Sequence, residues 1–162
     1  MTAARKPTAI GVLRHEALIY RSPEHYAAAA GTFVRAGLDA GEPVLIAVPG
    51  ESIDLMKPAL GGAADRVRFV DMTEAGRNPG RIIPAVLHAF VTEHSPGRVR
   101  VIGEPIWAGR SAAEYPACVQ HEALINLALA DANATILCPY DARRLAAAVL
   151  VDAERTHPVS GV

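Results

Sequence analysis

Short apolar runs rich in β-branched residues alternate along the chain with longer segments rich in Ala and Leu. This alternation is typical of βα units, which form a parallel sheet with helices on its faces. Most of the apolar runs are continuous, as expected for strands that are buried on both faces. The pattern predicts five strands, at Ala17–Tyr20, Val44–Val48, Val67–Val70, Val99–Ile102 and Thr135–Leu137.

Each predicted strand is followed by residues that favour a helix. The first helix has the clearest start, because Ser22 is a good N-cap residue and Pro23 suits the first helical position. Ser111 and Glu114 have the spacing of a capping box for the fourth helix, although Pro116 leaves a later start open. The expected helices are Pro23–Leu38, Glu51–Leu60, Pro79–His94, Ser111–Asp131 and Arg143–Arg155.

This order of elements predicts an α/β fold, a three-layer, mostly parallel five-stranded sheet with helices on both faces. The chain has 162 residues, of which 51% are hydrophobic. A chain of this length buries about 70% of its extended surface, so its core needs no disulfide or metal. No linker interrupts residues 10–157. We therefore expect a single domain over residues 1–162, with its core at about 10–157.

Charge and composition exclude several classes of protein. The formal net charge is -1, and no basic stripe follows the chain, which argues against direct nucleic-acid binding. Two cysteines, Cys118 and Cys138, are too few for a secreted disulfide scaffold, and they form no CxxC motif. Residues 1–7 lead into no apolar stretch of signal-peptide length, and no apolar run is long enough for a membrane span. We expect a cytoplasmic protein.

Several catalytic and nucleotide-binding motifs are missing. The first strand-to-helix turn, Tyr20–Pro23, has neither GxGxxG nor GxxxxGK[ST], so it lacks a phosphate cradle. His-Glu-Ala-Leu-Ile occurs at residues 15–19 and 121–125, but Ile19 and Ile125 stand where HExxH zinc chemistry needs a second histidine. We expect the first copy in a strand and the second in a helix, so the repetition is best explained by chance. No GxSxG nucleophile elbow is present.

Polar and aromatic residues gather at the predicted carboxyl ends of the strands, where open α/β sheets bind their ligands. Three strands run into a proline, Pro49, Pro105 or Pro139, which we expect to end strand pairing and to shape a pocket. Glu104 stands close to Trp107, the only tryptophan, and such a pair suits a polar or cationic small ligand. The alternative is that Glu104 caps a loop and Trp107 fills the core.

His121 shares a helical face with Cys118, Ile125 and Ala128, since these residues are spaced by three and four. This face is expected to point toward the sheet, with His121 as an ordinary core histidine or as a site residue. Cys138 is expected to be a small buried residue rather than a nucleophile.

A mixed metal site from His15, Glu104, His121 and Cys138 is a further alternative. Sequence separation offers no geometric test of it, and we predict no metal, no cofactor and no catalytic residue.

Six blocks of the sequence resemble the MEDS domain, the sensory domain of methanogens, methylotrophs and the dichloromethane-responsive repressor. The resemblance covers about residues 10–157, and the Gly-Glu-Pro-Ile-Trp and Cys-Pro-Tyr-Asp blocks are its most specific parts. The blocks are His15–Tyr20, Gly41–Val48, Arg66–Met72 with Gly76–Pro79, Gly103–Arg110, His121–Asn126 and Cys138–Asp141.

This resemblance implies a degenerate relative of the KaiC/RecA-like ATPases that has lost its phosphate-binding residues, in agreement with the Tyr20–Pro23 turn. It implies a non-catalytic sensor of small organic molecules that controls a transcriptional or anti-sigma-type output. In actinobacteria, similar domains commonly precede a histidine-kinase-like ATPase domain, and elsewhere they accompany helix-turn-helix regulators. The motif positions expected to line the ligand site are His15, Tyr20, Glu104, Trp107, His121, Asn126, Cys138 and Tyr140.

The expected partners are a small organic ligand and a regulatory protein, such as a kinase-like ATPase, a sigma-factor-control protein or a helix-turn-helix module. A homodimer is also compatible with the sequence. Since no output module lies within the 162 residues, we expect a stand-alone member or an excised sensor. Two alternatives stay open: a small-molecule enzyme that uses Glu104 or His121 as acid or base, and a ligand-free protein-interaction module.

Overall fold

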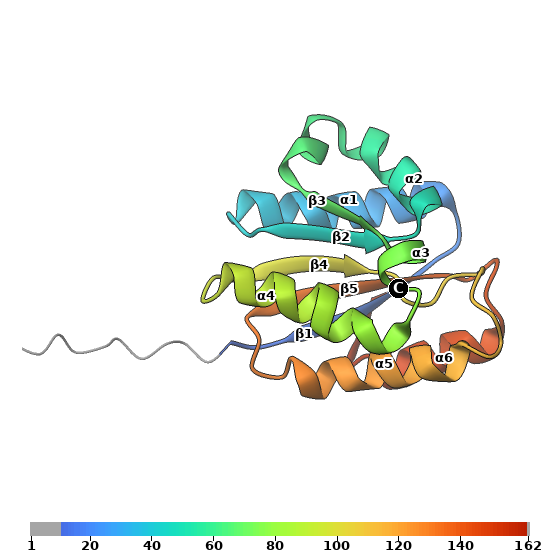
Figure 1. Cartoon of the computed structure of the whole chain (residues 1–162). Coiled ribbons are helices and arrows are strands. Elements are labelled where there is room, and N and C mark those ends of the chain that lie inside the picture. The colour runs from blue at the N-terminus through green and yellow to red at the C-terminus, as the bar shows by residue number, and fades with distance from the viewer. Residues whose placement is uncertain (1–10, 162) are drawn as a thin grey trace, which may run out of the picture.

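The computed structural model describes residues 11–161 and contains one parallel sheet with helices on both faces (Figure 1). Its strand order is β3-β2-β4-β5-β1-β6, and every neighbouring pair is parallel. The α/β class and the three-layer architecture are thereby confirmed. Residues 1–7, on which the prediction about a signal peptide depends, lie outside the described residues.

All five predicted strands are present: β2 has the predicted bounds, β3 is shifted by one residue, and β1, β4 and β5 are longer than predicted. Their bounds are β1 Arg14–Tyr20, β2 Val44–Val48, β3 Arg68–Asp71, β4 Val99–Gly103, β5 Ala134–Asp141 and β6 Val159–Gly161. The sixth strand was not predicted, because three residues after Pro158 are too few to show a periodic pattern. It pairs with β1 at the edge of the sheet.

The helices are also close to the predicted segments. Their bounds are α1 Pro23–Asp39, α2 Gly50–Leu60, α3 Met72–Ala75, α4 Ala89–His94, α5 Tyr115–Ala128 and α6 Ala147–Thr156. The predicted Pro79–His94 helix is divided into a 3-10 turn, a π-helix over Ile83–His88 and α4. Ser111 and Glu114 do exchange the two hydrogen bonds of a capping box, but they do so in the turn before α5.

Pro139 does not end strand pairing as predicted, since it lies within β5 opposite Leu18 of β1. Successive residues of a parallel strand direct their N–H groups to opposite neighbours. Ala142 N–H donates to Tyr20 of β1, so the position of Pro139 faces the other side, toward β4. The β4 ladder has already ended at Leu137. The missing N–H of Pro139 therefore costs no hydrogen bond of the ladder.

Two apolar cores lie on opposite faces of the sheet. One face packs against α1 and α2 through residues such as Leu18 and Ile46, and the other packs against α4, α5 and α6 through residues such as Ala17 and Ile136. Figure 1 shows these two helical layers with the strands between them. Among residues 11–161, no helix is long and apolar enough to cross a membrane.

Candidate functional site

The alternation of side chains along the strands separates the expected site residues into two groups. On β1, His15 faces the side of α5 and α6, whereas Tyr20 faces α1 and α2. On β5, Cys138 and Tyr140 lie on the α5 side with His15. Glu104 lies on the α1 and α2 side, where it contacts Ser52 of α2. The predicted single site is thus two separate sites on opposite faces of the sheet.

The α5 face contains a fully buried cluster of polar side chains, and its centre is Glu122 of α5. Glu122 Oε2 lies 3.1 Å from His15 Nε2 and 3.4 Å from His157 Nε2, and the Cys138 thiol approaches it at 3.7 Å. His15 Nε2 also lies 3.4 Å from Cys138 Sγ. We call these four residues the histidine cluster.

Hydrogen bonds from neighbouring groups orient both imidazole rings of the histidine cluster. His15 Nδ1 pairs with Asn126 Oδ1 at 3.0 Å, and Asn126 Nδ2 donates to the carbonyl oxygen of Thr156. His157 Nδ1 donates to the carbonyl oxygen of Ala153 at 2.7 Å. Asn126, which sequence analysis places in the ligand site, therefore supports His15 from outside the cluster.

The histidines determine the charge of Glu122. Burial by itself raises the pKa of this carboxyl, but the adjacent imidazoles of His15 and His157 outweigh burial and hold the pKa well below its usual range. Tyr140 packs edge-on against the His157 ring, with centroids 5.7 Å apart. The cluster is closed on this side by an aromatic wall rather than by solvent.

The inward face of α5 differs in part from the predicted one. Cys118, His121 and Ile125 are buried as expected, but Ala128 is exposed and Leu129 takes its place. Burial lowers the pKa of His121, which lies near the histidine cluster without belonging to it. Glu122 was not predicted as a site residue. Its spacing of four from Cys118 places a charged residue on the inward face of the helix, and this unusual position could have identified it. His157 follows α6 and carried no comparable signal.

On the opposite face, Glu104 is a buried carboxyl with a single polar partner. The Ser52 hydroxyl donates to Glu104 Oε2 at 3.0 Å. Burial raises the pKa of Glu104 to about 8, since this one hydroxyl only partly offsets desolvation and the nearby acidic groups Glu51 and Asp141 oppose ionisation. Glu104 is therefore mostly protonated at neutral pH and can donate a hydrogen bond.

A cleft of about 250 Å³ opens at the carboxyl ends of β1 and β5, and Glu104 does not line it directly but contacts Ser52, which does. We call it the Glu104 cleft, because Ser52, the hydrogen-bond partner of Glu104, lines it. An ion pair of 2.7 Å joins Arg144 to Glu51 across this region, and Asp141 binds Arg143. The full lining is Tyr20, Pro23, Tyr26, Glu51, Ser52, Leu55, Asp141, Arg143 and Arg144.

Trp107 is not part of the Glu104 cleft. It packs against the core of the α5 face, and the Arg110 guanidinium stacks 3.9 Å from its ring centroid. Arg110 also donates to the carbonyl oxygens of Pro105, Gly76 and Arg77. Trp107 and Arg110 thus hold the loop after β4 in place, and Trp107 is separate from the Glu104 cleft.

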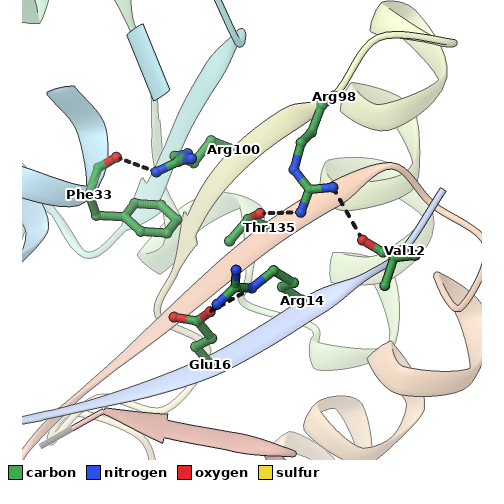
Figure 2. A pocket seen from close by; sticks show the side chains of 7 residues that line it. All are labelled: Val12, Arg14, Glu16, Phe33, Arg98, Arg100 and Thr135. Carbon is green, nitrogen blue, oxygen red and sulfur yellow. Dashed lines mark hydrogen bonds and ion pairs between the residues drawn. The ribbon is translucent and has the colours of Figure 1, made fainter. Parts of the chain in front are cut away.

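A larger groove of about 480 Å³ lies at the opposite edge of the sheet, near the amino ends of β1, β4 and β5 (Figure 2). Three arginines line it, but each already binds an acceptor of this chain. Arg14 binds Glu16, Arg98 binds Thr135, and Arg100 binds the Phe33 carbonyl oxygen, as the dashed lines of Figure 2 show. With its cations engaged, this groove is a weaker candidate than the Glu104 cleft.

Comparison with known families supports the resemblance drawn from the sequence. The family model of the MEDS domain, the methanogen/methylotroph, DcmR sensory domain, matches residues 14–158. A comparison with curated proteins and with solved structures found no match. The family match spans β1 to β5, both candidate sites and α1 to α6, and it ends just before β6. The chain belongs to the MEDS family of sensory domains.

Proposed function

We propose that this domain is a non-catalytic sensor that binds a small polar organic molecule in the Glu104 cleft and controls a transcriptional or anti-sigma-type output. The observation that carries the proposal is a protonated, buried carboxyl beneath an open cleft at the carboxyl edge of a parallel sheet. This edge is where open α/β sheets bind ligands. The sensory family of the chain supports the same role.

The chemistry of the cleft defines the class of ligand. The Tyr20 hydroxyl lines the cleft and offers a hydrogen-bond donor, whereas Asp141 is ionised and accepts. Neutral Glu104 can donate to a ligand that takes the place of its contact with Ser52. The Tyr20 and Tyr26 rings lie 4.9 Å apart and supply an apolar wall. A volume of about 250 Å³ suits a molecule of only a few heavy atoms. The proposed ligand is therefore small, neutral and able both to accept and to donate hydrogen bonds.

The contacts around the cleft suggest how binding reaches an output. Arg144 lies in the turn between β5 and α6, and its ion pair with Glu51 joins that turn to α2. A ligand that alters this exposed pair changes the relative stability of two positions of α6. Such coupling typically amounts to about 1–3 kcal/mol and requires different ligand affinities for the two states. We infer that α6 or a dimer face contacts the regulatory partner, a kinase-like ATPase, sigma-factor-control protein or helix-turn-helix module.

Calorimetric titration of the purified chain with a library of small metabolites tests the proposal. We expect saturable binding of at least one compound, weakened about tenfold by Glu104→Gln, because an amide does not reproduce the carboxyl hydroxyl donor. Glu93→Gln is the matched control, since Glu93 forms an exposed pair with Arg68 far from the cleft, and it should bind normally.

Three outcomes would overturn the proposal in different ways. Absence of any saturable binding, with the regulatory effect in cells retained, would favour a protein-interaction module. Turnover of a bound compound that Glu104→Gln abolishes while binding persists would favour an enzyme. A partner pull-down that is unaffected by ligand and by Arg144→Ala would contradict the coupling through α6.

A further inference from the structure

The histidine cluster gathers four potential metal ligands from four separate parts of the chain. His15 comes from β1, Glu122 from α5, Cys138 from β5 and His157 from the end of α6. Their ligand atoms all lie within 4.8 Å of one another, and each residue is at most 4% exposed. Residues that are separated by more than 140 positions thus converge on one closed point of the core.

The distances within the cluster fit a four-coordinate ion. Bonds of about 2.0–2.3 Å from zinc to nitrogen, oxygen and sulfur place the ligand atoms of a tetrahedron about 3.3–3.8 Å apart. The observed separations are 3.1 Å for His15 to Glu122, 3.4 Å for His157 to Glu122, 3.4 Å for His15 to Cys138 and 3.7 Å for Cys138 to Glu122. Four of the six distances between pairs of ligand atoms are therefore already close to those of a tetrahedral site.

Hydrogen bonding to carbonyl oxygens determines which nitrogen of each ring carries its proton. Ala153 O can only accept, so the Nδ1 of His157 must be the protonated nitrogen. Thr156 O can only accept, so Asn126 turns its Nδ2 toward Thr156 and its Oδ1 toward His15. His15 Nδ1 is then protonated as well. This outer shell of Nδ1–H donors to carbonyl groups is the usual arrangement around metal-binding histidines.

The other nitrogen of each ring, Nε2, lies toward Glu122 Oε2. Glu122 Oε1 accepts no hydrogen bond from any residue within 11–161. A divalent cation bound among the four side chains would be neutralised, because two uncharged imidazole ligands, one carboxylate and one thiolate together carry a charge of -2.

We propose that His15, Glu122, Cys138 and His157 form a closed binding site for a divalent transition-metal ion, with Zn²⁺ as the ion that this ligand set suits best. Imidazole and thiolate ligands favour zinc over magnesium or calcium, and four protein ligands are typical of a structural site. On binding, the Cys138 thiol releases its proton to solvent as the sulfur–metal bond forms. The ion would tie the end of α6 to β1, on the face opposite the Glu104 cleft.

Cobalt titration of the chain, purified without a histidine tag and stripped with a chelator, tests this site directly. We expect one equivalent of Co²⁺ to give visible absorption of a tetrahedral complex and a near-ultraviolet thiolate band. Zn²⁺ should then displace Co²⁺ and abolish both signals. A wild-type chain that binds neither ion at one equivalent, or gives no thiolate band, would overturn the proposal without any variant.

Matched variants then assign the ligands. Cys138→Ser should abolish the thiolate band, whereas Cys118→Ser, which changes the other buried cysteine, should leave it unchanged. Asn126→Ala should reduce metal affinity by about 10–100-fold, as expected for a residue that supports a ligand from the outer shell. Equal loss in Cys138→Ser and Cys118→Ser, with both variants folded by circular dichroism, would contradict the assignment.

Discussion

Glu104 and Glu122 are two buried carboxyls on opposite faces of the same sheet, and they differ in their partners. Glu104 is 4% exposed and Glu122 is 0% exposed, so burial alone does not distinguish them. Glu104 contacts one hydroxyl beneath an open cleft, whereas Glu122 contacts two imidazoles and a thiol in a closed core. The pKa of Glu104 is raised to about 8, and the pKa of Glu122 is held well below its usual range.

The comparison shows that the groups beside a buried carboxyl decide its charge, and that the charge decides its use. A hydroxyl hydrogen bond offsets only part of the desolvation of a carboxylate, so Glu104 keeps its proton and remains available to a neutral ligand. Two imidazoles stabilise the carboxylate form of Glu122, which suits it for a cation. The same residue type is therefore suited to the proposed sensing cleft on one face and to the proposed cation site on the other.

The largest expected effect on stability comes from changing Glu122 to glutamine, and the same change at Glu104 is the comparison. Glu122→Gln should lower the free energy of unfolding by about 3–5 kcal/mol at pH 7, because it leaves the buried histidines without their anionic partner. Glu104→Gln should not lower it, because an amide there replaces a carboxyl that is already mostly neutral. Urea denaturation of both variants and wild type measures the difference, and equal losses would contradict the assigned charge states.

The second prediction concerns pH. The folded chain holds the Glu104 proton up to about pH 8, whereas the unfolded chain releases it near the ordinary value of 4.5. Between these values the folded state binds more protons, so stability should fall as pH rises, by about 1.4 kcal/mol per pH unit. Denaturation between pH 5 and pH 8 should show this slope in wild type and not in Glu104→Gln. The same slope in both chains would assign the pH dependence to other groups.

The fold was largely predictable from the sequence, because continuous apolar strands and helix caps are local signals. Ser22, for example, caps α1 through the backbone N–H of His25 as its sequence position predicts. The prediction that a proline ends strand pairing was wrong at Pro139. Whether a proline interrupts pairing depends on which neighbouring strand its missing N–H would face. That information lies in the sheet register, which no local pattern contains.

The candidate sites were predictable only in part. The carboxyl-edge location of Glu104 follows from fold topology, but its separation from Trp107 depends on strand alternation and on the loop that Arg110 anchors. His15 and Cys138 were placed together in the alternative of a mixed metal site, and the structure brings these two side chains within 3.4 Å of each other. Their partners in the structure are Glu122 and His157 rather than Glu104 and His121, since side chains from the two faces of a sheet cannot meet.

A smaller effect is expected at the hydroxyl beneath the cleft. Ser52→Ala removes the only hydrogen bond that the residues within 11–161 donate to the Glu104 side chain, so it should raise the pKa of Glu104 further and cost about 1 kcal/mol. The loss should be larger at pH 9, where Glu104 is ionised, than at pH 6. A double-mutant cycle with Glu104→Gln measures the coupling, and independent effects of the two substitutions would contradict this pairing.

The smallest change in stability is expected from removing one tyrosine hydroxyl at each site, and the two removals should differ in their effect on ligand binding. Neither the Tyr26 nor the Tyr140 hydroxyl finds a hydrogen-bond partner within the described part of the chain, so Tyr26→Phe and Tyr140→Phe should each change stability by less than about 1 kcal/mol. Tyr26 lines the Glu104 cleft, whereas Tyr140 packs against His157. Ligand affinity, measured by calorimetry, should therefore fall in Tyr26→Phe and remain unchanged in Tyr140→Phe. The reverse result would move the sensing site to the α5 face, because only there could the Tyr140 hydroxyl reach a ligand.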